Sequence, residues 1–236
     1  MSLNWADIVD GTWPAAGYET LGPFQLRAGQ GGGSRVSAAS ALSTATDADI
    51  DAAEAAMQAM GQNSIFCLRP GDEALDAQLA LRGYDILDPV NIYVCPAVQL
   101  ADQPIPPVMV FSVWEPLEIM REIWATAGIG PERLAVMQRA KGPKTSLLLR
   151  HNDKPSGVAF VAMHGEVAMV HALEILPEHR RHGLGHWTMR AAAIWARDNG
   201  AQSLSVICTK ANEGANGLYR ALGMEIAGEY HYRHLV

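Results

Sequence analysis

Hydrophobic residues along the chain follow two spacings, one typical of strands and one typical of helices. Alternating or continuous apolar runs predict strands over residues 23–27, 35–39, 63–68, 88–94, 146–150, 157–163, 166–175, 204–208 and 225–234. Helical spacing predicts helices over residues 46–60, 72–82, 115–127, 131–138, 183–199 and 214–222. Strands that alternate with helices in this way predict an α/β fold.

The segments between these elements add detail. The first twenty residues predict a helical turn and a loop, and Thr46 is a candidate N-terminal cap for the first long helix. Residues 29–34, which read Gly-Gln-Gly-Gly-Gly-Ser, predict a flexible hairpin connection. They make a poor phosphate loop, because they join two strands rather than open a helix.

The proline-rich segment 103–107 is the clearest break in the pattern and predicts a boundary between domains 1–105 and 106–236. The two halves contain an internal echo, in which residues 75–86 resemble residues 215–226 when Gly83 is aligned with Gly223. Both copies follow the order strand, helix, glycine, strand. This favours a structural repeat, although any helix that ends in glycine before a strand shares that order.

Composition and charge limit the classes of partner. The net charge of -7 argues against nucleic acid, because phosphate neutralisation needs a basic face. Residues 1–105 hold 13 acidic against 4 basic residues, whereas residues 106–236 hold 12 against 14. The second half therefore suits a phosphate-bearing ligand better than the first half does.

The chain also lacks the patterns of membrane and secreted proteins. No apolar run approaches the roughly 18–20 residues that cross a bilayer, and the first seven residues do not resemble a secretory signal. Cys67, Cys95 and Cys208 are too scattered for a metal site or a disulfide framework. We therefore expect a cytoplasmic protein that does not bind membranes. The sequence leaves a homodimer open.

The most informative chemistry lies where the strand 166–175 gives way to the helix 183–199. The connecting loop contains Arg180-Arg181-His182-Gly183-Leu184-Gly185. A helix start presents unpaired backbone amides and the positive end of the helix dipole, which together suit a phosphate or pyrophosphate group. Glycine lets such a ligand approach the backbone closely. We therefore predict that the amides of residues 181–186 form a cradle for a diphosphate.

The same six residues match the Arg/Gln-x-x-Gly-x-Gly/Ala signature of GNAT acetyltransferases, which the chain resembles from Val108 to its end. Asn212 and the segment Tyr219–Met224 resemble the later Asn and Tyr-x-x-x-Gly-Phe positions of that family. The resemblance implies the mixed-sheet fold of acyl-CoA N-acyltransferases. Together with the internal echo, it implies two such sheets in tandem, of which residues 1–105 form a partial one.

The resemblance also implies acetyl-CoA as the co-substrate, with direct transfer to a primary amine of a small molecule or a protein. Carried over position by position, it assigns cofactor binding to Ile175, Leu176, Arg180, Arg181, His182, Gly183, Leu184, Gly185, His186, Asn212 and Tyr219.

Direct transfer needs a group that takes the amine proton and a group that protonates the departing thiolate. Tyr219 is the predicted acid by its match to the family, and Glu174 is the candidate base, with a structural role open for each. The thioester oxygen needs a donor, which we place on the backbone between Glu174 and Leu176. Because His171 and Glu174 are three residues apart on a strand, we expect only one of them to face the cleft.

Rival interpretations concern metals and other functions. His179, His182 and His186 suggest a metal, but no further ligand is evident nearby, so we favour histidines near a phosphate and no metal. A non-catalytic acyl-CoA-binding or regulatory protein is the main rival function, and a nucleotide-binding protein is another.

We expect the first half to lack a cofactor site. In the alignment of the internal echo, Leu79 occupies the position of Tyr219. The acidic residues in segment 43–49, which corresponds to the phosphate loop, would repel pyrophosphate. We expect this half to complete the hydrophobic core and to form part of the wall of the acceptor site. Its acidity would then favour a cationic acceptor.

Overall fold

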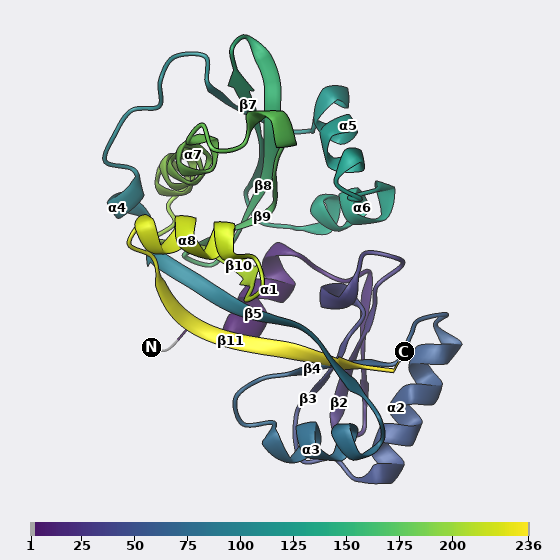
Figure 1. Cartoon of the computed structure of the whole chain (residues 1–236). Helices are drawn as coiled ribbons and strands as arrows, with labels where there is room; N and C mark the ends of the chain where they lie inside the picture. Colours follow the sequence, from purple (N-terminus) through teal and green to yellow (C-terminus); the bar gives the residue numbers. More distant parts are fainter. Residues whose placement is uncertain (1–2, 236) are drawn as a thin grey trace.

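The computed structural model describes residues 3–235, which fold into one sheet flanked by helices (Figure 1). Its strands are β1 (Gly17–Leu21), β2 (Phe24–Ala28), β3 (Ala39–Ala41), β4 (Ile65–Leu68), β5 (Asp85–Pro96), β6 (Val110–Val113), β7 (Lys144–His151), β8 (Lys154–His164), β9 (Val167–Ile175), β10 (Ser203–Thr209) and β11 (Glu225–His234). Its helices are α1 (Trp5–Thr12), α2 (Asp47–Ala59), α3 (Glu73–Leu81), α4 (Ala97–Leu100), α5 (Glu118–Thr126), α6 (Pro131–Arg139), α7 (Leu184–Asp198) and α8 (Glu213–Ala221), with 3₁₀ turns η1 (Ser34–Val36) and η2 (Pro177–His179).

The strands form a single continuous sheet in the order β1-β2-β3-β4-β11-β5-β10-β9-β8-β7-β6. Parallel and antiparallel pairs both occur in it, so the predicted α/β class with a mixed sheet is confirmed. The expectation of two separate sheets is wrong. The sheet runs through both halves because β5 and β11, the last strand of each predicted half, pair with each other.

These two central strands are exchanged between the halves. β4 is followed by α3 and then β5, yet β4 pairs with β11. In the same way β10 is followed by α8 and then β11, yet β10 pairs with β5. Outside them, β3 pairs parallel with β4, and β9 pairs parallel with β10. Each half therefore supplies the strand that extends the sheet of the other half (Figure 1).

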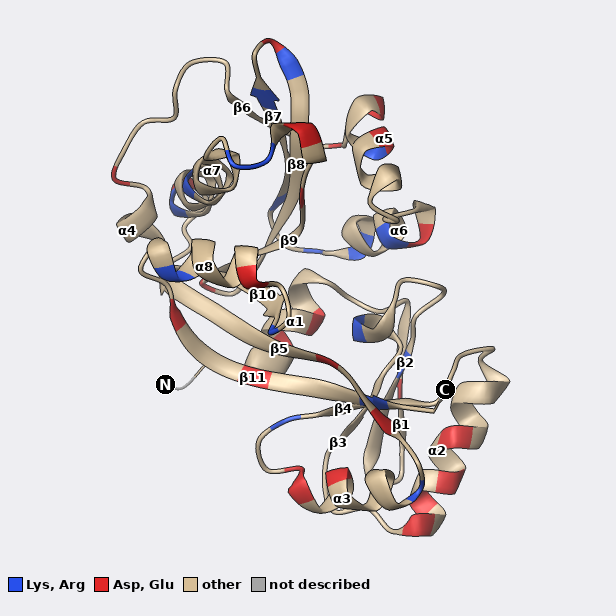
Figure 2. Cartoon of the chain, viewed as in Figure 1, with Lys and Arg blue, Asp and Glu red and all other residues tan. Residues whose placement is uncertain are grey.

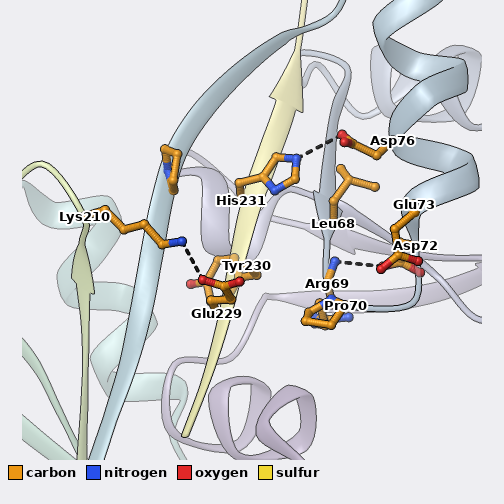
Figure 3. Close-up of a pocket in the computed structure, with 11 residues that line it drawn as sticks. Leu68, Arg69, Pro70, Asp72, Glu73, Asp76, Lys210, Glu229, Tyr230 and His231 are labelled. Atoms are coloured by element: carbon orange, nitrogen blue, oxygen red, sulfur yellow. Dashed lines mark hydrogen bonds and ion pairs between the residues drawn. The ribbon is translucent and has the colours of Figure 1, made fainter. Parts of the chain in front are cut away.

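The internal echo of the sequence reappears in side-chain contacts. On α3, Asp76 Oδ1 lies 3.0 Å from His231 Nε2 of β11 (Figure 3). The same oxygen accepts from Arg233 Nε, also on β11, at 2.7 Å. At the aligned position of α8, Asn216 Oδ1 accepts from Tyr93 Oη at 2.8 Å and from a second side chain of β5 at 3.1 Å. In both copies one polar helix residue binds two side chains of the exchanged strand.

Helices cover both faces of the second half of the sheet. The odd-numbered residues of β8 between 159 and 163 pack in the core beneath α7 and α8, and the even-numbered residues between 158 and 162 pack beneath α5 and α6. α1 contacts β8 and β9 on the α5 and α6 face. In the first half, α2 and α3 pack together on one face. Between residues 3 and 235, no helix is both long and apolar enough to cross a membrane.

The elements that the sequence did not predict are short or exposed. β1 and β6 are the two edge strands of the sheet, and neither contains a fully buried residue, so neither carries an alternating apolar pattern. The predicted strand 35–39 is instead the turn η1 followed by β3.

The proline-rich segment 103–107 lies between α4 and β6, and the division of the chain there stays a prediction. Met1, Ser2 and Val236, at the outer ends of the predicted domains, lie outside the described residues.

Candidate active site

The neighbouring strands β9 and β10 separate toward their carboxyl ends. Their pairing runs from Val167 opposite Ser203 to Val170 opposite Val206 and stops there, although both strands continue. A cavity of about 930 Å³ opens at this gap. It is lined by the ends of both strands, by the loop before α7 and by the start of α8, and its size suits a small-molecule site.

A β-bulge in β9 shapes the wall of this cavity. Val158 and Phe160 of β8 lie opposite Glu174 and His171, so β9 carries one extra residue here, and Ala172 has a φ of 48°. The extra residue reverses the alternation of side chains along the strand. His171 and Glu174 consequently both line the cavity, and the expectation that only one of them faces the cleft is wrong.

The loop before α7 leaves its backbone amides open. Arg181 and Gly183 have φ values of 66° and 75°, and α7 begins at Leu184 without a side-chain cap. The first amide here that reaches a carbonyl is that of Trp187, which donates to Gly183 at 3.2 Å. Within residues 3–235, the amides of residues 181–186 have no hydrogen-bond partner. They lie at the positive end of the helix dipole, where an anion is stabilised.

The corresponding helix of the first half, α2, has a closed start. Thr46 Oγ1 accepts from the Asp49 amide at 3.3 Å, and the Asp49 carboxylate accepts from the Thr46 amide at 2.8 Å. This capping box occupies backbone donors and adds a negative charge. An anion at α2 would therefore meet a carboxylate where α7 offers free amides.

Most residues predicted to contact the cofactor lie on the cavity wall. They are Ile175, Arg180, Arg181, Gly183, Leu184, Gly185, His186, Asn212 and Tyr219. Leu176 and His182 are not among the lining residues. The Leu176 amide donates to the Ser156 carbonyl at 3.0 Å, and the His182 ring stacks on His151 with centroids 4.6 Å apart.

The position of Leu176 identifies the amide that faces the gap. Because the Leu176 amide bonds across to β8 and successive amides of a strand point to opposite sides, the Ile175 amide points away from β8. β10 no longer pairs with β9 at this level, so this amide is directed into the cavity. Asn212, at the far side of the gap, caps α8 by accepting from the Ala215 amide at 3.0 Å.

Tyr219 from α8 and Glu174 from β9 face the same cavity. Tyr219 is 4% exposed and packs against Tyr93 with ring centroids 5.3 Å apart. Burial raises the pKa of the Tyr219 phenol, which stays protonated at neutral pH. Burial also raises the pKa of the Glu174 carboxyl, against the opposing effect of Arg180 and Arg133. The cavity thus combines a proton donor with a carboxylate of increased basicity.

Sequence reasoning missed two cationic residues of the cavity wall, Arg35 from η1 and Arg133 from α6. Arg35 Nη1 donates to His171 Nδ1 at 3.0 Å. The local sequence around Arg35 gives no signal of this role, because the contact joins residues 136 positions apart. Only the three-dimensional arrangement brings Arg35 of the first half to this cavity.

Other candidate groups lie around the cavity. His151 Nδ1 lies 3.3 Å from His179 Nδ1, beside the loop before α7. Across residues 3–235, no group of three or more His, Cys, Asp or Glu side chains is arranged to hold a metal ion. The three cysteines are free and buried. Cys208 lines the cavity, where burial raises its pKa to about 11.

Comparison with known proteins gives a family match for the second half of the chain. Residues 114–224 match the model of the acetyltransferase (GNAT) family. A Bacillus subtilis (strain 168) protein named uncharacterized N-acetyltransferase YobR is 26% identical over 126 residues. This alignment covers 52% of this chain and 49% of that protein, so it spans about half the length of the curated relative.

Solved structures resemble the chain well beyond the matched segment. A GCN5-related N-acetyltransferase from Kribbella flavida superposes with a TM-score of 0.69 at 19% identity, covering 99% of this chain and 96% of that one. A tandem GNAT protein from the clavulanic acid biosynthesis pathway has a TM-score of 0.58 at 15% identity, covering 80% and 68% of the two chains. At these identities the similarity concerns the fold, and it confirms the GNAT fold.

Proposed function

Because residues 114–224 form a domain of the acetyltransferase (GNAT) family, we propose that this chain transfers an acetyl group from acetyl-CoA to a primary amine of a small molecule or a protein. One observation carries the proposal. A single cavity joins the open amides before α7 to Tyr219 and Glu174 through the gap between β9 and β10. Such a path suits a long co-substrate with a diphosphate at one end and a reactive thioester at the other.

In this proposal the amides of residues 181–186 hold the diphosphate of acetyl-CoA, and Arg180 and Arg181 add charge-assisted hydrogen bonds. Gly183, with its positive φ, turns the chain so that these amides converge. His186 and Asn212 border the same space, and the thioester reaches the gap beside Ile175.

The reaction is a direct transfer. The amine nitrogen attacks the thioester carbonyl, so a C–N bond forms while the C–S bond breaks. Glu174 takes the proton that the amine loses, which a carboxylate of raised pKa does more effectively. The Ile175 amide donates to the carbonyl oxygen as negative charge develops on it. Tyr219 gives its phenolic proton to the departing thiolate.

The first half, residues 1–105, serves in this proposal as a degenerate copy that binds no cofactor. Leu79 occupies the position that aligns with Tyr219, and it is fully buried in the core of the first half. Residues 106–236 supply the catalytic groups. The first half supplies β5, which pairs with β10 directly beside the cavity, and part of the acceptor wall.

Acetyl-CoA binding and turnover test the proposal. Acetyl-CoA at 100 times its Kd should stabilise the protein by about 2.7 kcal/mol and raise its Tm, whereas ATP should not. Thiol release from acetyl-CoA, measured across an amine library, reports turnover. A protein whose Tm does not respond to acetyl-CoA contradicts the proposal.

Tyr219→Phe distinguishes an enzyme from a non-catalytic acyl-CoA-binding protein. The variant keeps the ring but loses the phenolic proton, so kcat should fall by about 10²-fold or more while acetyl-CoA affinity is retained. Tyr84→Phe is the matched control, because Tyr84 is a buried tyrosine of the first half that bonds to Glu54. Acetyl-CoA binding without thiol release from any amine would support the regulatory alternative.

A further inference from the structure

The cavity passes through the sheet and opens on both faces. On the face covered by α7 and α8, its wall includes Leu218, Tyr219 and the open loop before α7. On the face covered by α5 and α6, its wall includes Arg133 and, from the first half of the chain, Arg35. The proposed function places acetyl-CoA on the first face, so the acceptor amine must arrive through the opening on the second face.

Arg35 lies in the wall of this second opening. Its Nη1 donates to His171 Nδ1 at 3.0 Å. Its Nε is buried and has no hydrogen-bond partner in the chain from residue 3 to residue 235. Burial lowers the pKa of the Arg35 guanidinium, but Tyr230 and Tyr232 raise it above its usual value, so Arg35 places a positive charge in the cavity wall.

His171 fixes the orientation of the Arg35 guanidinium. Arg35 can only donate, so His171 Nδ1 carries no proton and the ring proton is on Nε2. His171 Nε2 lies 3.0 Å from Thr12 Oγ1, whose hydroxyl donates to the Ile8 carbonyl at 2.8 Å. Each group in this relay has one assigned role. The relay uses only Nη1 of Arg35, and the hydroxyls of Tyr230 and Tyr232 on β11 also lie against this guanidinium.

The glycine-rich segment 29–34 brings Arg35 to the opening. This segment packs against α6, where a Cβ on Gly32 would lie only 2.7 Å from Val136 Cγ2. Arg133 of the same helix places its guanidinium beside Gly33. Larger side chains would lift the segment from α6. Glycines therefore let two arginines, one from each half, converge on the same opening.

Arg27 shows how the Nε and Nη2 atoms of an arginine bind a carboxylate in this molecule. Arg27 Nε bonds Asp10 Oδ1 at 2.9 Å, and Arg27 Nη2 bonds Asp10 Oδ2 at 2.7 Å. This two-point contact is the geometry in which arginine recognises a carboxylate. Within residues 3–235 the corresponding two nitrogens of Arg35 make no hydrogen bond. Among the described residues that line the cavity, Glu174 is the one carboxylate, and the structure gives Arg35 no bond to it.

We propose that the acceptor is an amine that also carries a carboxylate, as in a free amino acid, and that the Arg35 guanidinium binds this carboxylate. The inference rests on the proposed function, since it names the substrate class of the same site. The acceptor amine then faces Glu174 across the gap, and Arg133 adds positive charge at the carboxylate end.

The substrate class is opposite to the cationic acceptor that the acidic first half suggested. Many acids of that half lie on α2 and α3, at the end of the molecule remote from α7 (Figure 2). Of the described residues in the first half, Arg35 is the one that lines the cavity. Net charge of a half therefore says little about the charge of the surface that it presents to the substrate.

A matched acceptor panel tests the inference. Each L-amino acid is compared with its amide and with the amine that lacks the carboxylate, using thiol release from acetyl-CoA to obtain kcat and KM. The wild-type chain should show kcat/KM at least about tenfold higher for the amino acid than for its amide, because neutralising the carboxylate removes two charge-assisted hydrogen bonds.

Arg35→Gln should raise KM for the amino acid at least about tenfold and leave the KM values for the amide and for acetyl-CoA nearly unchanged. Arg121→Gln is the control, because Arg121 lies on α5 of the same face but outside this cavity. If Arg35→Gln does not fold, Arg35→Lys keeps the charge without the fork and should show an intermediate KM.

The outcomes separate the two proposals. If acetyl-CoA raises the Tm but amino acids react no faster than their amides, or no amino acid reacts at all, the inference is overturned and the transferase proposal stands. A preference for amino acids that survives Arg35→Gln also overturns it. If acetyl-CoA does not bind, both proposals fail together.

Discussion

Lowering the pH should destabilise this chain through His171, and the structure gives the size of the effect. His171 is 4% exposed, and burial together with the adjacent Arg35 holds its pKa well below the usual 6.5. Arg35 already donates to Nδ1, so the native state has no place for a second ring proton. In the unfolded chain the same imidazole is exposed and titrates near pH 6.5.

Below pH 6.5 the unfolded state therefore binds a proton that the native state does not bind. The free energy of unfolding then falls with decreasing pH, with a limiting slope of about 1.4 kcal/mol per unit. Between pH 7.5 and pH 5.5 the loss due to His171 is about 1.4 kcal/mol, because the imidazole of the unfolded chain is about one-tenth protonated at the upper pH and about nine-tenths protonated at the lower pH. Hydrogen bonding to Arg233 lowers the pKa of Asp76, so that carboxyl titrates below this window.

Urea unfolding at the two pH values measures the effect. His171→Gln keeps an oxygen that accepts from Arg35 but does not titrate. The decline in the free energy of unfolding between pH 7.5 and pH 5.5 should be smaller in this variant by about 1.4 kcal/mol. His164→Gln, at an exposed histidine, should decline as the wild type does.

Equal declines in the wild type and in His171→Gln would refute this reasoning. They would mean that His171 accepts a proton in the native state. The ring could then not accept from Arg35, and the orientation assigned to the Arg35 guanidinium would be wrong.

Two further substitutions test the cofactor side and the strand exchange. Gly185→Val should weaken acetyl-CoA binding at least about tenfold by calorimetry, because a Cβ at Gly185 lies 2.8 Å from Leu218 Cδ2 on the cavity wall. Gly217→Ala, where a Cβ meets nothing within 4 Å, is its control, and equal affinities would contradict the cradle. Asn216→Ala should lower the free energy of unfolding by about 2–3 kcal/mol in urea, because the buried Tyr93 hydroxyl loses its acceptor. A loss below about 0.5 kcal/mol would show that this contact does not couple α8 to β5.

Elements that bury their apolar residues in a regular pattern were predicted well from the sequence. β8 lies in the middle of the second half, so its apolar residues form an uninterrupted run, and α7 shows helical spacing because one stripe packs on the sheet. β1 and β6 have a neighbour on one side only and exposed side chains, so no apolar pattern marks them. The sequences of β5 and β11 do not reveal their exchange, because contacts between segments far apart in the chain determine which strands pair.

The candidate site likewise contains local features that the sequence predicts and features that depend on contacts between distant segments. The loop and helix start at residues 180–186 are local features, so a short motif predicts them. The bulge at Ala172 depends on how β8 and β9 align, and it changed which side chains share the cavity. Arg35 reaches the site through contacts of segment 29–34 with α6, about a hundred residues further along the chain. No local pattern contains that information.

Strand pairing shows what the first half contributes to the second half. β5 pairs with β10 over seven positions, from Pro96 opposite Ser203 to Val90 opposite Thr209. Without it, β10 would expose an open edge beside the cavity, and β11 would lose the strand that connects it to β10. The first half also supplies Arg35. In the proposed function the first half binds no cofactor, yet its strand β5 and its Arg35 still contribute to the cavity of the second half.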